Sequence, residues 1–162
     1  MSYPGTGSLE EVGMGVGEGA TANLPLPGLS GDATSARVFE EFIVPAATRF
    51  APDIILVSAG YDSHWKDPLA GLQYCSTTYH RLCSDLKALA AALCSGRIVF
   101  LLEGGYDLEA LSHSVAESFR GLLDAPSAGR RLDPDRSALQ DEPTDKVKRM
   151  LREARAIHSL AS

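Results

Sequence analysis

The sequence is short of three features: long hydrophobic runs, positive charge and paired cysteines. No stretch of about 18 apolar residues occurs, so we expect no membrane-spanning helix. The 21 acidic residues outnumber the 15 basic ones, and the formal net charge of −6 offers no basic surface for direct contact with nucleic acid. The three cysteines form no C-x-x-C pair, and the N-terminus lacks a secretory signal pattern. These absences favour reduced thiols and an intracellular location.

The first 31 residues are unusually rich in glycine and hold eight of the 15 glycines. Glycine loses the most conformational entropy on ordering, and this segment has little apolar area to bury, so it cannot fold alone. Such a long opening loop is typical of the interior of a larger structure. Within it, residues 21–26 have the composition of a short strand.

Beyond residue 32 the hydrophobic spacing alternates between helix and strand patterns. Residues 32–50 repeat at helical spacing, with a kink expected at Pro45. Residues 53–58 and 98–102 are short apolar runs typical of strands buried on both faces. Helical spacing returns after 76–78 and again from Asp107. The buried side of the latter helix is expected to consist of Leu108, Leu111, Val115, Phe119 and Leu122. The order predicts an α/β fold with parallel strands and a right-handed crossover.

The C-terminal part has a different character. Residues 125–143 are polar, with prolines and charges, and are predicted to form a linker. Residues 144–162 are predicted to form an amphipathic helix, whose Lys- and Arg-rich side is better explained as a solvated surface than as a binding patch. The predicted apolar side consists of Val147, Met150, Leu151, Ala154, Ile157 and Ala161.

Unusual residues follow both predicted strands. Asp62 lies just after the first strand, and Tyr106 follows the second behind two glycines. Because ligands bind beyond the carboxyl ends of parallel strands, we expect these two residues to lie at one edge of the sheet.

Each residue has two interpretations when taken alone. A carboxylate at the position of Asp62 caps a turn or binds a cation, and the cap is the commoner role. Asp62 and His64 have a short metal-ligand spacing, but a histidine there is more often an ordinary loop residue. The Tyr106 phenol would donate a hydrogen bond to an oxyanion if it were held rigidly, or it would simply follow a Gly-Gly turn before a helix.

The motifs together resemble a known family, the class II-type histone deacetylases and the related acetylpolyamine amidohydrolases. The resemblance covers residues 3 to about 124. The motifs that carry it, in order along the chain, are Tyr3-Pro4-Gly5-Thr6-Gly7, Asn23-Leu24-Pro25-Leu26-Pro27, Val57-Ser58-Ala59-Gly60-Tyr61-Asp62 with Asp67-Pro68-Leu69, and Leu102-Glu103-Gly104-Gly105-Tyr106.

The resemblance implies an arginase-deacetylase three-layer α/β/α sandwich, with residues 1–124 as the C-terminal half of its catalytic domain. It also implies zinc-assisted hydrolysis of an acetyl-amide bond. Asp62 matches a zinc ligand, and Tyr106 matches the tyrosine that polarises the substrate carbonyl and stabilises the tetrahedral intermediate. His64 matches a loop residue of the motif and not a ligand. The positions that line the family's acyl-lysine channel correspond to Tyr3, Leu69, Gly104 and Gly105.

The sequence departs from the family pattern in what it lacks. The family's other two zinc ligands, an Asp-x-His pair, and its catalytic histidine pair precede the Pro-Gly-Thr-Gly loop, and none of the 162 residues matches them; the Asp62-Ser63-His64 stretch lies after that loop. Because catalytic zinc normally takes three protein ligands, we expect the chain alone to bind zinc weakly and to lack appreciable deacetylase activity. An exposed sheet edge and apolar surface are also expected, where a protein partner would bind.

Two interpretations of the chain stay open. It is either the C-terminal portion of a zinc-dependent lysine deacetylase or a truncated isoform that binds the partners of the enzyme without turnover. The substrate stays open between acetylated lysine peptides, such as those of basic histone tails, and acetylated polyamines. Nuclear, cytosolic and organellar locations are all compatible with the sequence.

Overall fold

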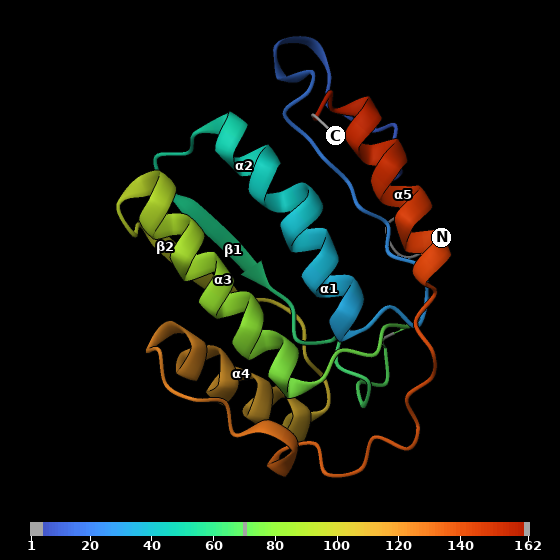
Figure 1. Ribbon diagram of the computed structural model, residues 1–162, viewed down its shortest axis with the longest axis vertical. Coiled ribbons are helices and arrows are strands. Elements are labelled where there is room, and N and C mark those ends of the chain that lie inside the picture. The colour runs from blue at the N-terminus through green and yellow to red at the C-terminus, as the bar shows by residue number, and fades with distance from the viewer. Residues whose placement is uncertain (1–4, 70, 161–162) are drawn as a thin grey trace.

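The computed structural model describes residues 5–69 and 71–160, and Figure 1 shows how its elements are arranged. No helix in these ranges is long and apolar enough to cross a membrane. The elements in chain order are η1 (Gly15–Gly17), α1 (Asp32–Val38), η2 (Phe39–Ile43), α2 (Val44–Phe50), β1 (Ile55–Ala59), α3 (Ser76–Cys94), β2 (Ile98–Leu102), α4 (Leu108–Leu122), η3 (Gly129–Arg131) and α5 (Thr144–Ile157).

The sheet in the described part of the chain consists of β1 and β2, which pair in parallel. Ile55 lies opposite Ile98, and Ala59 lies opposite Leu102. Helix α3 connects the two strands, so the predicted parallel α/β arrangement is confirmed. The prediction of a strand over residues 21–26 is wrong, because that segment has an extended course without a strand partner.

One face of this sheet is open. Leu56, Val99 and Leu101 point to the same face in this register, and they are 64%, 44% and 50% exposed. Helix α3 lies in front of the strands in Figure 1 and covers the opposite face. The prediction that both faces are buried is therefore wrong for these strands, whereas the expected exposed apolar surface is confirmed. We call Leu56, Val99 and Leu101 the open sheet face.

The helical stretch from α1 to α2 is interrupted by the π-helical turn η2. Pro45 lies just after this turn and has no N–H to donate to the carbonyl of Glu41 one turn earlier. Arg155 of α5 satisfies that carbonyl instead, because its Nη1 donates to Glu41 O at 3.3 Å. The distortion expected at Pro45 is thus present as a π-turn, and a side chain from α5 compensates for the missing hydrogen bond.

The apolar side predicted for α4 is confirmed in part. Leu111 and Val115 pack against a core cluster of buried tyrosines, whereas Leu108 is 79% and Phe119 60% exposed, so the prediction is wrong for these two residues. Small residues of α4 also lie against α3, and a side chain at Gly121 would overlap the carbonyl oxygen of His80. Close approach of the two helices therefore decides the buried side of α4. The residues of α4 that are buried are Ala110, Ser114, Glu117, Ser118 and Gly121.

The predicted C-terminal amphipathic helix is present as α5. Its buried residues Val147, Met150, Leu151 and Ala154 form a core with Val38 and Phe42 of the α1–η2 stretch. In Figure 1, α5 runs beside α1 and α2, with the N-terminal segment alongside. Ile157 is 41% exposed, and Ala161 lies outside the described residues.

The cysteines Cys75, Cys83 and Cys94 are free thiols and are all buried. Burial raises the pKa of the Cys75 thiol to about 12, with nearby Asp32 acting in the same direction. A thiol with such a pKa stays protonated and is a poor nucleophile. The cysteines therefore serve as core residues.

Candidate functional site

The loops that follow β1 and β2 adjoin, as expected from the parallel pairing. The ladder extends past the strand ends, because Glu103 N donates to Ala59 O at 3.0 Å and Tyr61 N donates to Gly104 O at 2.8 Å. These bonds bring the segment after β1 against the Gly104-Gly105 turn. The two motifs singled out in the sequence therefore meet at one edge of the sheet.

The carboxylate of Asp62 packs directly on Gly104. A side-chain carbon at Gly104 would overlap Asp62 Oδ2, so only glycine leaves room for the carboxylate in this position. Gly105 has a φ of 140°, a value that L-residues rarely adopt, and it lies close to the Cβ of Tyr61. Both glycines are therefore required by the backbone path and by the carboxylate, whatever else they line.

Asp67 connects the two loops through a single carboxylate. Its Oδ2 accepts hydrogen bonds from the amides of Tyr106 at 2.7 Å and Asp107 at 3.3 Å, and its Oδ1 accepts one from Leu69 N at 3.0 Å. The side chain is buried, with the residue 6% exposed. The backbones of Leu69 and Tyr106, one from each loop, are thus held by the same group.

Burial acts to raise the pKa of Asp67, but the hydrogen bonds from Tyr106, Leu69 and Asp107 outweigh it and lower the pKa below its ordinary value. A lowered folded-state pKa means that the ionised carboxylate stabilises the fold above the unfolded-state pKa. That contribution is lost as the pH falls through the folded-state value. Sequence reasoning placed Asp67 only within a motif, although an Asp two residues before a loop amide is a recognised signal for this type of hydrogen bond.

The backbone of Tyr106 is fixed on both sides by hydrogen bonds, but its side chain is exposed to solvent. Its amide is bound by Asp67, and the next residue, Asp107, caps α4 by accepting a hydrogen bond from Ala110 N at 2.8 Å. The Tyr106 side chain is 57% exposed, and Leu69 is 71% exposed. The sequence-predicted residues Asp62, Leu69, Gly104, Gly105 and Tyr106 are thus gathered by the two loops, whereas Tyr3 lies outside the described residues.

Two buried tyrosines, Tyr61 and Tyr79, attach the loop after β1 to helices α3 and α4. Tyr61 Oη donates to Ser118 Oγ of α4 at 3.1 Å, and Tyr79 Oη of α3 donates to the carbonyl of Tyr61 at 3.1 Å. The rings of Tyr61 and Tyr79 lie 4.9 Å apart between centroids. Burial raises the pKa of both phenols, so both remain donors at neutral pH. The residue before Asp62 is therefore anchored to two helices.

A second group of residues near the site joins His64 to Asp133, a pairing that the sequence did not indicate. His64, which is fully buried, lies with its Nε2 3.1 Å from Oδ1 of Asp133, which is 1% exposed. Burial acts to raise the pKa of Asp133, but hydrogen bonds from His64 and Ser76 outweigh it and lower the pKa to about 2. His64 is a buried loop residue, and both of its ring nitrogens have hydrogen-bond partners within the chain. A separation of 69 positions concealed its partner.

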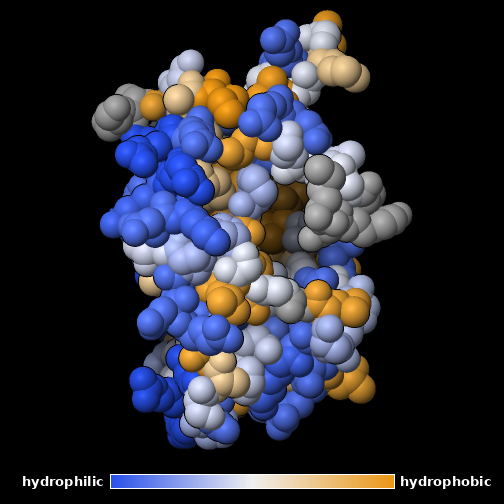
Figure 2. All heavy atoms as spheres, turned by 90° about the vertical axis from the view of Figure 1, so that its right-hand side faces the viewer, coloured by the Kyte–Doolittle hydropathy of each residue, from blue (hydrophilic) through white to orange (hydrophobic). Residues whose placement is uncertain are grey.

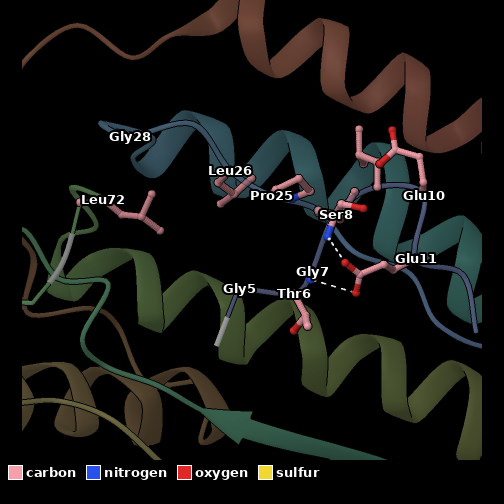
Figure 3. Close-up of a pocket in the computed structure, with 13 residues that line it drawn as sticks. Gly5, Thr6, Gly7, Ser8, Glu10, Glu11, Pro25, Leu26, Gly28 and Leu72 are labelled. Carbon is pink, nitrogen blue, oxygen red and sulfur yellow. Dashed lines mark hydrogen bonds between the residues drawn. The ribbon is translucent and has the colours of Figure 1, made fainter. Parts of the chain in front are cut away.

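A cavity of the described chain lies away from these two loops. Figure 2 shows a hollow with hydrophobic atoms at its bottom, on the face that carries the N-terminal segment and α5. A cavity of about 890 Å³ lies between residues 5–11, residues 24–28 and Leu72. Figure 3 shows its polar rim, where the Glu11 carboxylate accepts hydrogen bonds from the amides of Gly7 and Ser8. None of the described site residues lines it, so the cavity is separate from the two motif loops.

The described residues do not by themselves fit a catalytic zinc. Catalytic zinc takes three protein ligands, and no group of three His, Cys, Asp or Glu side chains within residues 5–69 and 71–160 is arranged to hold a metal ion. Asp62 is the one side chain at the strand ends that the resemblance assigns to the metal.

A sequence profile of the histone deacetylase domain matches residues 1–122. The chain belongs to the histone deacetylase domain family. A chloroplastic histone deacetylase 14 of Arabidopsis thaliana is 57% identical over 159 residues, covering 98% of this chain and 37% of that protein. A chloroplastic histone deacetylase 10 of Oryza sativa subsp. japonica is 55% identical over 159 residues, covering 98% and 36%. The chain thus spans little more than a third of the length of these deacetylases.

Solved deacetylase structures have the same fold over nearly the whole chain. The crystal structure of the HDA15 HD domain superposes with a TM-score of 0.78 at 30% identity, covering 96% of this chain and 39% of that one. The structure of the histone deacetylase Clr3 superposes with a TM-score of 0.79 at 27% identity, covering 97% and 25%. The predicted deacetylase family and its α/β fold are confirmed.

The hydrogen bonds of Asp67 predict a local effect of Asp67→Asn. The amide side chain replaces one acceptor oxygen by a donor, so the backbone amides of Tyr106 and Asp107 lose part of their hold. Hydrogen bonds to charged groups contribute about 1.5–3 kcal/mol, and we expect hydrogen exchange at these two amides to accelerate about tenfold or more. NMR-detected exchange measures this, with the exposed Asp53→Asn as the matched control. Unchanged exchange in Asp67→Asn would contradict the assigned role.

Proposed function

We propose that this chain supplies part of the active site of a zinc-dependent lysine deacetylase, with Asp62 as one zinc ligand and Tyr106 as the carbonyl-polarising phenol. One observation supports this above the others: the Asp62 carboxylate lies against Gly104 while Asp67 holds the amide of Tyr106 two residues further on. The arrangement brings the loops that carry a carboxylate and a phenol to one rim, in a chain that belongs to the deacetylase family.

The contribution of Tyr106 follows from how it is held. Its backbone is bound by a buried carboxylate on one side and by the start of α4 on the other, while the phenol is left exposed. Because this backbone is fixed, the exposed phenol stays at the rim, where it would donate a hydrogen bond to an acyl oxygen as negative charge develops on it. The phenol would therefore stabilise the oxyanion formed when the amide bond of an acetylated substrate is attacked.

Asp62 has the complementary role. It is a half-buried carboxylate that packs on a glycine. Carboxylate oxygens are among the ligands of zinc, but one carboxylate is not a catalytic zinc site. The remaining ligands and the proton-transferring histidines that the family resemblance calls for have no counterpart in the sequence. A catalytic zinc site would therefore need ligands in addition to those of this chain.

The first test uses the purified chain. We expect it to hold far less than one zinc per molecule and to release no appreciable acetate from an acetyl-lysine peptide, because it offers one of the three ligands. Elemental analysis and an acetate assay measure the two quantities. Stoichiometric zinc together with acetate release would contradict the proposal of a partial site.

A complementation experiment tests the roles of Asp62 and Tyr106. The chain is co-expressed with a fragment of the Arabidopsis thaliana relative comprising the residues that this chain does not match. We expect zinc binding and acetate release to appear, Asp62→Asn to lower zinc occupancy, and Tyr106→Phe to lower kcat about 100-fold. Asp53→Asn is the control and should behave as wild type. A complemented Tyr106→Phe protein with unchanged kcat would refute the role of the phenol.

The open sheet face is the surface on which we place a protein partner. Leu56, Val99 and Leu101 form an apolar patch on paired strands, and exposed patches of this kind favour association. The occupant we propose is deacetylase sequence of the kind present in the longer relatives and missing from the match. A partner of this kind would explain both why the described sheet has two strands and why its apolar face is exposed.

Charge on the open sheet face should therefore prevent complementation. Leu56→Glu and Val99→Glu alter exposed side chains, so the chain should fold with a nearly unchanged Tm but fail to co-purify with the complementing fragment. Ala91→Glu, on the exposed side of α3, is the matched control and should co-purify normally. Normal co-purification of both open-face variants would rule this surface out as the contact.

The substrate and location are further proposals. We favour an acetylated lysine side chain as substrate, because the relatives from Arabidopsis thaliana and Oryza sativa are named histone deacetylases. Acetylated polyamines serve as the comparison substrate in the complementation assay. We also propose a chloroplast location, which the names of both relatives support. Immunodetection in purified plastids should find the chain there, and its detection in nuclei alone would overturn this location.

A further inference from the structure

The segment 125–143, predicted as a polar linker, makes buried contacts with the loop and helix that support the site. It lies beyond the residues 1–122 that match the deacetylase profile. Gln140 exchanges hydrogen bonds with Gln73, and Arg136 Nη2 donates to Thr77 Oγ1 at 3.2 Å. Between these contacts and η3, Asp133 is inserted into the interior with 1% of its surface exposed. The segment is thus fixed against the start of α3.

Asp133 is fully used as an acceptor. Its Oδ2 accepts the amide of Ser76, the first residue of α3, at 2.8 Å, and its Oδ1 contacts His64 Nε2 at 3.1 Å. Arg136 approaches the same carboxylate at 3.9 Å. A buried carboxylate is stable only with such partners, and together these connect the C-terminal segment to a helix N-terminus and to the loop after β1.

His64 stabilises the turn between Asp62 and Asp67. Its Nδ1 accepts the amide of Lys66 at 3.2 Å, which leaves the proton on Nε2, the atom that donates to Asp133. Its backbone also closes the turn, because its amide donates to Tyr61 O at 3.2 Å and its carbonyl accepts Asp67 N at 2.9 Å. A fixed imidazole therefore fixes the backbone from which Asp62 and Asp67 project.

The presence of Ser76 beside this pair does not make it a nucleophilic triad. In such a triad the acid binds one imidazole nitrogen and the serine the other. Here Ser76 Oγ, at 3.4 Å, and Asp133 both face Nε2, while Nδ1 is bound to the backbone. His64 and Ser76 are each 0% exposed, so a substrate has no access to them. The group is a structural support.

We propose that Asp133 is a positioning residue of the candidate site, which acts from the C-terminal segment by locking His64 and thereby the turn that carries Asp62 and Asp67. Because Asp67 accepts a hydrogen bond from the amide of Tyr106, the position of that amide also depends on the turn. This inference rests on the proposed function only for the roles of Asp62 and Tyr106. The link from Asp133 to the turn rests on the hydrogen bonds alone.

The experiment compares the full chain with Asp133→Ala and Asp133→Asn by NMR. We expect Asp133→Ala to shift the His64 Nε2–H resonance and to accelerate hydrogen exchange about tenfold at the amides of Asp67 and Tyr106. Asp133→Asn retains an acceptor for His64 Nε2–H and should restore the ring resonance and most of the protection. If Asp133→Ala does not fold, Asp133→Asn still tests the connection: a His64 Nε2–H resonance that shifts while exchange at Asp67 and Tyr106 keeps the wild-type rate would overturn the proposal.

Glu142→Gln is the matched control, because Glu142 is a carboxylate of the same C-terminal part that caps α1 through the amides of Gly31, Ala33 and Thr34. It should accelerate exchange at those amides and leave the turn unchanged. Equal effects of Asp133→Ala and Glu142→Gln on the turn would overturn the proposal by showing general destabilisation. This readout is independent of activity, so a failure of Tyr106→Phe to lower kcat would refute the proposed function and not the positioning by Asp133.

Discussion

The buried carboxylate of Asp67 is the interaction on which the geometry of the site depends. Its oxygens accept hydrogen bonds from backbone amides of both loops at the strand ends. These bonds hold the two loops together at one edge of the sheet. Parallel strands bring the loops to the same edge, but pairing alone fixes only their backbones near the sheet. The side chains that do chemistry lie several residues beyond the strands, where an additional bond is required to define their positions.

Local sequence signals predicted the order and type of the elements well. The apolar run at 98–102 became β2, and the serine and threonine residues at 76–78 begin α3. Asp107 caps α4, as expected from an aspartate before a helical pattern. The convergence of Asp62 and the Gly104-Gly105-Tyr106 turn also followed from the sequence, because carboxyl ends of parallel strands share an edge. The first three inferences use signals within a single element, and the last uses only the order of the elements along the chain.

The failures have a common physical origin in contacts that are distant in sequence. A run of apolar residues gives no information on whether a second layer covers both faces of the strand, and Leu56 is exposed although its sequence context is that of a buried strand. In α4, Leu111 and Val115 pack inward as periodicity predicted, but the close approach to α3 at Gly121 buries small residues while Leu108 and Phe119 are exposed. Asp133 appeared to be one charge among many in a polar segment, because nothing local distinguishes a carboxylate that will pair with a histidine 69 positions away.

The open sheet face also bears on the lifetime of the chain in a cell. Paired strands with leucine and valine side chains in water resemble the partly folded states that chaperones bind and proteases remove. A polypeptide that carries such a face is retained when another surface covers it and is degraded when none does. Its abundance would therefore follow the supply of its covering surface, more closely than it would follow its own rate of synthesis.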